Sequence, residues 1–266
     1  MSELESEAME AEFDTVAGWT EEAVRALGAE TAIPAGCRGS GSEGALRWLA
    51  ARLELRPGVR VLDSGAGVGG PAAWLAAESG VRPVCAEPMA AAVHASRRLF
   101  GLRSVVAMGQ QLPFADASFD AAVCLGVLCT TSDKAGALGE LRRVLGDGAR
   151  LGLLVFVADG PLTSAAPEGN EFPSEAETRE LLAAAGFEVL EATEADLADS
   201  PEEWTRAADA VDAEVERRHG QEQAFRQAQE NSGRVGRLLS DGSLRPWLAV
   251  ASAVVTARNA RDTSPN

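Results

Sequence analysis

The segment Val61–Gly70, with the sequence VLDSGAGVGG, constrains the fold more than any other part of this chain. An apolar run over residues 59–62 ends in Asp63, and glycines follow at positions 65, 67 and 69 before a helical pattern begins at Gly70. Glycine allows backbone conformations and close approaches that a Cβ atom prevents. A strand, a tight glycine turn and a helix in this order are typical of a βα unit that holds a nucleoside.

Two acidic residues follow apolar runs at positions suited to ligand binding. Asp63 lies two positions before the first glycine, where the dinucleotide fingerprint G-x-G-x-x-G requires no acid. Glu87 ends the next apolar run, over residues 81–86, where a carboxylate suits the two hydroxyls of a ribose. Together these features favour S-adenosylmethionine (SAM) over NAD. Taken singly, Asp63 is also compatible with a cap or turn ligand, and Glu87 with a solvated strand end.

Strand and helix patterns alternate through the middle of the chain. The predicted strands lie near 59–63, 82–87, 104–108, 119–126 and 150–157, the predicted helices near 70–79, 89–99, 134–145 and 175–185, and two further strands follow Gly186 and Trp247. Apolar runs that are continuous rather than alternating indicate strands covered on both faces. We therefore expect an α/β protein with a Rossmann-like, doubly wound, mostly parallel seven-stranded sheet and helical cap elements.

At 266 residues the chain suits one domain with inserted cap elements. Helical spacing near the N-terminus predicts a lid that breaks at Gly18 and ends in a connector over 33–42. The predicted division is an N-terminal helical lid segment (1–42), a SAM-binding core (43–198), a helical cap insertion (199–245), the last core strand (246–258) and a disordered tail (259–266).

The charge balance limits the choice of partners. With 24 basic and 40 acidic residues the formal net charge is −16, which argues against binding a nucleic-acid backbone. The acidity serves either solubility or attraction of a cationic substrate. No window approaches the ~20 apolar residues of a membrane span, and the acidic first thirty residues do not resemble a secretory signal. We expect a cytoplasmic protein, either monomeric or homodimeric.

Cysteine and histidine are too sparse and scattered to predict a metal site. The four cysteines, Cys37, Cys85, Cys124 and Cys129, show no metal-ligand spacing, so no metal is expected. Of the two histidines, His94 lies on the helix after Glu87, facing away from an acceptor, and His219 is expected on the surface of the cap. No catalytic base is assigned.

Four further motifs identify a family. Leu-Pro-Phe at 112–114 and Ser-Phe-Asp at 118–120 precede the fourth strand, ELRRVL at 140–145 precedes the fifth, and Ala-Gly-Phe at 185–187 introduces the sixth. With the glycine loop, this order and spacing over residues 59–193 resembles the class I SAM-dependent methyltransferases, particularly the ubiquinone-biosynthesis-like small-molecule branch.

The resemblance implies a set of cofactor-binding residues. Asp63 would hold the ammonium group of SAM, directly or through water, and Glu87 would accept hydrogen bonds from both ribose hydroxyls. Gly65 and Gly67 would let the loop pass beneath the methionine part, and Gly69 would belong to the same cofactor-binding loop. Pro88 and Met89 would lie near the adenine, and the carbonyl of Leu125 would contact the methionine amine. Where relatives often have Asp or Asn to read the adenine, this chain has Met108, which leaves the backbone of Gly109 or the side chain of Gln110 for that role.

The acceptor side departs more from the family. Cys129 and Thr130 replace a His pair found in many relatives. In the loop 167–173, three polar residues either orient an amine or hydroxyl of the acceptor or are simply solvated. Trp19 and Trp204 either form a wall of the acceptor pocket or pack in the core. Arg38 either binds the cofactor carboxylate or lies on the surface. The three loop residues are Glu168, Asn170 and Glu171.

These features predict methyl transfer from SAM to an O, N or C nucleophile of a small organic acceptor, with S-adenosylhomocysteine (SAH) as product. The transfer would be an in-line displacement in a capped pocket, since a cap obstructs polymers. Two alternatives remain: a SAM-binding enzyme of the cyclase type that transfers no methyl group, and a regulatory module with a vestigial SAM site.

Overall fold

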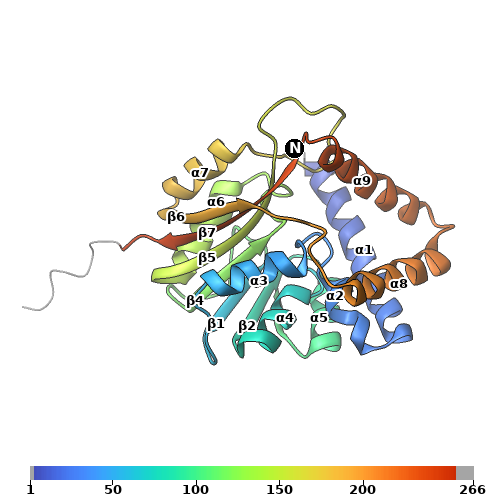
Figure 1. Cartoon of the computed structure of the whole chain (residues 1–266), viewed down its shortest axis with the longest axis horizontal. Helices are drawn as coiled ribbons and strands as arrows, with labels where there is room; N and C mark the ends of the chain where they lie inside the picture. The colour runs from blue at the N-terminus through green and yellow to red at the C-terminus, as the bar shows by residue number, and fades with distance from the viewer. Residues whose placement is uncertain (1–2, 256–266) are drawn as a thin grey trace, which may run out of the picture.

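The computed structural model describes residues 3–255, and within them seven strands form one sheet in the order β3-β2-β1-β4-β5-β7-β6 (Figure 1). The strands are β1 (Arg60–Ser64), β2 (Arg82–Glu87), β3 (Arg103–Val106), β4 (Phe119–Leu125), β5 (Leu145–Val157), β6 (Phe187–Glu194) and β7 (Arg245–Ala253). Strand β7 pairs antiparallel with β5 and β6, and the remaining pairs are parallel. The predicted α/β fold with a mostly parallel seven-stranded sheet is confirmed.

Helices cover both faces of this sheet. They are α1 (Glu3–Leu27), α2 (Ala32–Gly36), α3 (Glu43–Arg52), α4 (Gly70–Ser79), α5 (Ala90–Phe100), α6 (Lys134–Val144), α7 (Glu175–Ala184), α8 (Glu202–His219) and α9 (Gln223–Ser240), with a short 3₁₀ helix at Ala29–Thr31. Leu46 of α3 and Trp74 of α4 belong to the core on one face. Leu138 of α6 and Leu182 of α7 belong to the core on the other. Both faces are therefore buried, as the continuous apolar strands predict.

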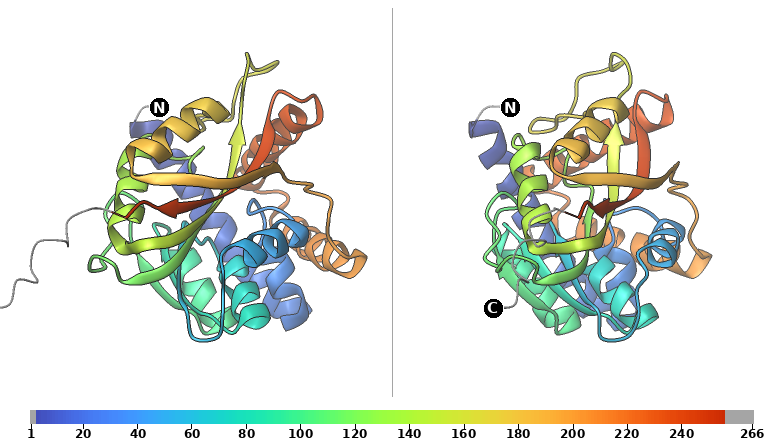
Figure 2. Two further views of the ribbon diagram at one scale, coloured as in Figure 1. Left: turned by 60° about the vertical axis from the view of Figure 1, so that its left-hand side comes forward. Right: turned by 90° about the vertical axis from the view of Figure 1, so that its left-hand side faces the viewer.

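The parallel strands end at one edge of the sheet, and the loops that follow them gather there. Figure 2 shows β5 pointing toward the long loop 158–174 at this edge. The glycine loop follows β1, Pro88 and Met89 follow β2, and residues 126–133 follow β4. In open α/β sheets, ligands bind outside the carboxyl ends of the strands, so this edge is where the site is sought.

Helices α1, α8 and α9 lie together at one side of the sheet (Figure 1). Trp19, Val211 and Phe225, one from each helix, share a buried cluster against which Phe100 of α5 packs. The side-chain amide of Asn231 in α9 also donates to Glu12 in α1 at 2.7 Å. These three helices, here called the helical cap, thus form one packed unit that rests on α5.

The predicted break at Gly18 is wrong, because α1 runs without interruption from Glu3 to Leu27. A glycine inside a helix costs only about 1 kcal/mol relative to alanine. Burial of Ala17, Trp19 and Ala23 on either side of it against neighbouring helices offsets that cost.

Three predicted boundaries also need correction. The connector 33–42 begins inside a helix, α2, whose last residue Gly36 lies so close to Gly70 that a Cβ on Gly70 would collide with its backbone. Strand β5 begins at Leu145 rather than near 150, because the register with β4 shifts between Phe119 and Ala121. The last strand spans Arg245–Ala253 instead of 246–258. Residues 256–258 and the predicted tail 259–266 lie outside the described residues.

Candidate functional site

Asp63 is one of two deeply buried acids at the carboxyl edge. It lies in β1 opposite Cys85 of β2 and Val123 of β4, and it is 2% exposed. Its Oδ2 atom has no hydrogen-bond partner. Burial, followed by the negative charge of Glu87, raises the pKa of Asp63 to about 7, although a hydrogen bond from the backbone of Ala72 lowers it. Because buried polar atoms normally have partners, the free oxygen suits a cationic ligand group.

Glu87, at the end of β2, is equally buried and anchors the glycine loop. Its Oε2 accepts from the backbone N–H of Gly67 at 2.7 Å, and its Oε1 accepts from that of Met89 at 3.1 Å. Burial raises the pKa of Glu87, the two hydrogen bonds lower it, and Asp14 and Glu10 of α1 raise it further. A carboxylate offers about four acceptor positions. Two therefore remain for hydroxyl donors.

The glycine loop is held tightly against its surroundings. Gly65 has φ +76°, its N–H donates to the carbonyl of Ala86 at 2.8 Å, and a Cβ added to it would collide with Val127. Gly67 has φ +52° with open space around it, and Gly69, with φ +91°, precedes α4. The glycine at position 65 is thus required by packing against the loop after β4, a reason the sequence does not show.

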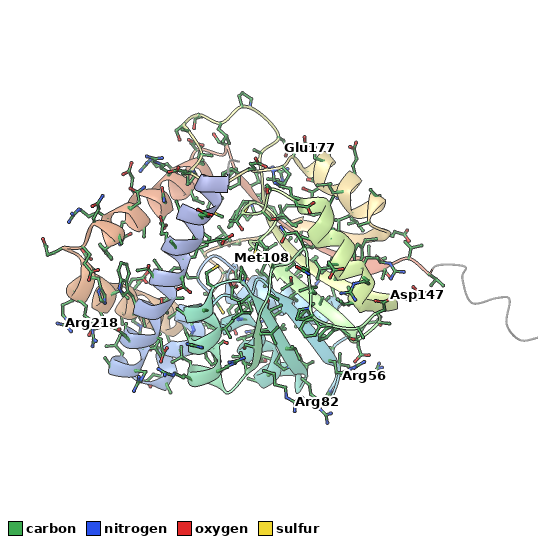
Figure 3. The ribbon with its side chains drawn as sticks, turned by 180° about the vertical axis from the view of Figure 1, so that it is seen from behind. Arg56, Arg82, Met108, Asp147, Glu177 and Arg218 are labelled. Carbon is green, nitrogen blue, oxygen red and sulfur yellow. The ribbon has the colours of Figure 1, made fainter. Side chains whose placement is uncertain are left out.

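The predicted adenine-side residues reach the same edge. Met89 is the residue before α5 and packs against the cluster that contains Val68 of the glycine loop, and Pro88 lies between it and Glu87. Met108 is 44% exposed in the loop after β3, between α1 and α6 in Figure 3, with Arg56 and Arg82 at the opposite end of the strands.

Gly109 and Gln110 continue that loop toward β4. A Cβ on Gly109 would lie 3.9 Å from the hydroxyl oxygen of Ser64, so this backbone is next to the end of β1. The side-chain amide of Gln110 donates to the hydroxyl of Thr131 at 2.6 Å. The Gln110 side chain is therefore engaged by the loop after β4, which leaves the backbone of Gly109 as the simpler of the two predicted adenine readers.

The loops after β4 and β5 meet at Cys129. Leu125 is the last residue of β4. In the loop that follows, the Cys129 thiol donates to the carbonyl of Gly126 at 3.2 Å. The Thr130 hydroxyl donates to the carbonyl of Val127 at 2.9 Å. The backbone N–H of Glu171 donates to the Cys129 carbonyl at 2.9 Å. Burial raises the pKa of Cys129 to about 11, so the thiol stays protonated at neutral pH and does not act as a base.

The remaining acceptor-loop residues have local roles. Asn170 closes a tight turn through a backbone bond to Pro167 and donates its amide to the carbonyl of Glu168. The Glu171 carboxylate pairs with Lys134, the one lysine in the sequence, at 3.3 Å. Beside this pair lies a cleft of about 640 Å³ between the start of α6, residues 171–173 and α7.

The structure gives the two tryptophans packing contacts. Trp19 is 8% exposed and stacks on His219 with ring centroids 4.6 Å apart. Trp204 packs against the core cluster beneath α3. Arg38 forms an ion pair with Asp212 of α8. These contacts correspond to the packing alternative for both tryptophans, while their predicted role as an acceptor wall stays a prediction.

His219 ends α8 and is partly buried, and its expected surface role stays a prediction. Its side chain is only 16% exposed, because the Trp19 ring covers one face and Glu222 and Glu22 approach its two nitrogens. His94 lies on α5 as predicted. Across residues 3–255 no three His, Cys, Asp or Glu side chains are grouped to hold a metal ion, and none of the helices is long and apolar enough to span a bilayer.

Sequence reasoning missed one residue of the site, Asp14. Its Oδ1 accepts from the backbone N–H of Ala91, in the first turn of α5, at 2.7 Å. The available signal was the helical spacing of Glu10, Asp14 and Ala17, which places them on one face of α1. Only the tertiary structure shows that this face meets the residues that follow Glu87.

Comparison of this sequence with known proteins finds similarity to methyltransferases. Residues 62–153 match the family model described as "Methyltransferase domain". The chain is similar to the O-methyltransferase resE of Aspergillus sclerotiorum, with 33% identity over 165 residues, which cover 56% of this chain and 62% of that protein. The chain thus spans less than two thirds of that relative's length.

Solved structures share the fold over a larger part of the chain. The [4+2]-cyclase SpnF superposes with a TM-score of 0.62 and 24% identity, covering 79% of this chain and 81% of SpnF. The geranyl diphosphate C-methyltransferase of Streptomyces coelicolor A3(2), solved with SAH, superposes with a TM-score of 0.60 and 16% identity, covering 79% of this chain and 77% of that one. At these identities the likeness concerns the fold.

Proposed function

We propose that this chain is a class I SAM-dependent methyltransferase that transfers the methyl group of SAM to a small organic acceptor bound at the carboxyl edge of its sheet. The observation that carries this proposal is the pair of buried acids, Asp63 and Glu87, which end neighbouring parallel strands on either side of the glycine loop. Asp63, whose buried Oδ2 has no partner, matches an ammonium group. Glu87, which keeps two acceptor positions, matches the two hydroxyls of a ribose.

The residues present fit SAM along its whole length. Asp63 would hold the ammonium group through its unpartnered Oδ2, with the carbonyl of Leu125 as a second acceptor. Glu87 would hold the ribose hydroxyls. Pro88, Met89 and Met108 would contact the adenine, and the backbone of Gly109 would read its edge. Bound SAM supplies an electrophilic methyl group on a sulfonium.

The protein's task in such a displacement is alignment and exclusion of water. The glycine loop is fixed by Glu87, by the carbonyl of Ala86 and by Val127, so its backbone holds one conformation. Ala17 of α1 and Ala92 and Ala95 of α5 pack against Val68 of this loop. We infer that these elements position the donor, while the loops after β4 and β5 position the acceptor.

We place the acceptor beside the junction of Cys129 and Glu171. The cleft of about 640 Å³ next to this junction is within the size range of small-molecule sites, and Phe172, Leu181 and Ala184 give it apolar walls. The Glu171 carboxylate, held by Lys134, is placed to accept a hydrogen bond from a hydroxyl or amine of the acceptor. The protonated Cys129 thiol contributes shape rather than proton transfer.

Calorimetry and a product assay test the proposal together. Purified protein is titrated with SAM, then incubated with methyl-labelled SAM and a panel of phenols, amines and carbon acids, and SAH is quantified. We expect SAM binding and SAH formation with at least one acceptor class. Binding without SAH formation would support a cyclase-like enzyme instead, and no binding would leave only a vestigial site.

A further inference from the structure

Helix α1 lies directly against the segments that would hold the nucleoside. Its Ala17 shares a buried cluster with Val68 of the glycine loop and with Ala92 and Ala95 of α5, and Met89 packs against that cluster. The glycine loop and the start of α5 flank Glu87 in sequence and in space. Groups on this face of α1 therefore lie next to the segments that flank Glu87.

Asp14 brings a negative charge to this position. Its carboxylate caps α5 from another helix by accepting from Ala91 N–H at 2.7 Å, since Met89, the residue before α5, provides no side-chain cap. The repulsion between Asp14 and Glu87 contributes to the raised pKa of Glu87. Asp14 thus lies close enough to Glu87 for their charges to interact.

Within residues 3–255, no basic side chain forms an ion pair with these acids. Among the ion pairs of the described residues, none includes Asp14, Asp63 or Glu87. Asp63 and Glu87 are each 2% exposed, so bulk salt screens them weakly. The site therefore has an excess of negative charge that a ligand must meet.

We propose that Asp14 is a specificity-determining residue that makes this site prefer the sulfonium cofactor over its thioether product. This inference rests on the proposed function. SAM and SAH differ by one positive charge: when the acceptor's electron pair takes the methyl group, the sulfur keeps the electrons of the broken bond and becomes neutral. A fixed negative charge nearby stabilises SAM but not SAH. Asp14 therefore favours SAM binding and lets SAH leave more readily after transfer.

Substitution of Asp14 by Asn separates charge from position. The Asn oxygen still accepts from Ala91 N–H, so the cap on α5 is kept while the charge is removed. By calorimetry at pH 8, we expect the Kd for SAM to rise roughly threefold to tenfold, the order of effect of removing one nearby charge from a partly buried site. The Kd for SAH should change less than twofold. Sinefungin, whose amine replaces the methylated sulfonium, should follow SAM when that amine is charged.

Two controls make the test decisive. Glu188→Gln changes the net charge equally but lies on the exposed face of β6, at the far edge of the sheet, and should leave both affinities unchanged. Asp14, unlike Asp63 and Glu87, is only partly buried and is therefore screened by salt, so in the unsubstituted protein raising salt from low to high concentration should reduce the preference for SAM over SAH. This second measurement requires no variant and stands even where a substitution impairs folding.

Three outcomes would overturn the inference. If Asp14→Asn leaves the ratio of the two Kd values unchanged while Asp14→Ala weakens SAM and SAH equally, Asp14 only positions α5. If the ratio is insensitive to salt as well, the charge of α1 has no part in selection. If the unsubstituted protein binds neither ligand, the proposed function fails first, and that result is distinct from an unchanged ratio.

Discussion

Replacing Asp63 by Asn should stabilise the protein in the absence of cofactor. Folding raises the pKa of this carboxyl from 3.8 to about 7, chiefly by burial. At about 1.36 kcal/mol per pKa unit, the ionised carboxylate destabilises the folded state by roughly 4 kcal/mol. An asparagine of the same shape has no charge to bury. The desolvated amide retains a cost of its own, so the net gain should lie between about 1 and 4 kcal/mol.

The sign of the pH dependence follows from the same values. Because the folded state binds the Asp63 proton more tightly than the unfolded state, the free energy of unfolding falls as pH rises from about 4 to about 7 and stays lowered above that. Urea unfolding without cofactor measures this. Asp63→Asn should exceed the original protein in stability at pH 8, and the difference should disappear near pH 4. A variant that is equally stable at pH 8, or less stable, would refute the reasoning.

The ligand side of the prediction uses the same carboxylate. Asp63 must be ionised to hold an ammonium group, so the Kd for SAM should rise about tenfold between pH 8 and pH 6, and binding should release a proton. Asp63→Asn should weaken SAM binding by about 1.5–3 kcal/mol and remove most of this pH dependence. Asp63→Asn should therefore gain stability and lose SAM binding. This combination is expected where a buried charge destabilises the fold but is needed to bind the ligand.

Other substitutions test separate parts of the site. Glu87→Ala should weaken SAM binding by about 1.5–3 kcal/mol in calorimetry and lower Tm, since it also leaves the N–H of Gly67 without its partner; an unchanged Kd would remove Glu87 from the site. Gly65→Ala should destabilise the fold by about 1–3 kcal/mol in urea unfolding, and Val127→Ala should recover part of that loss by removing the collision. Ala184→Trp should fill the cleft and lower kcat/KM for an acceptor found in the panel, with the Kd for SAM unchanged; an unaffected kcat/KM would place the acceptor elsewhere.

Local sequence was sufficient for the central half of the sheet and for placing Asp63, the glycine loop and Glu87 at its carboxyl edge. Asp63, the glycines and Glu87 come at the ends of consecutive strands, and parallel strands bring their carboxyl ends to one edge without further information. The observed strand order follows from the same local features, and the family model described as "Methyltransferase domain" matches the same part of the chain, residues 62–153. Helix α1 was the weakest prediction, because Gly18 is a breaker in isolation and its packing against α5 and α8 is a long-range effect.

The sequence by itself determined which residues meet at the cofactor edge, because strand ends and glycine turns are local features with a fixed spatial consequence. Only the tertiary structure decided the pKa values of those residues and which segments bury them. Asp14 reaches the start of α5 from a helix 77 residues earlier in the chain, and Glu171 reaches Cys129 across the gap between two loops. The raised pKa of Asp63 likewise comes from burial beneath neighbours that no spacing rule identifies. Burial and charge depend on everything packed around a group, so they emerge only when the chain is folded.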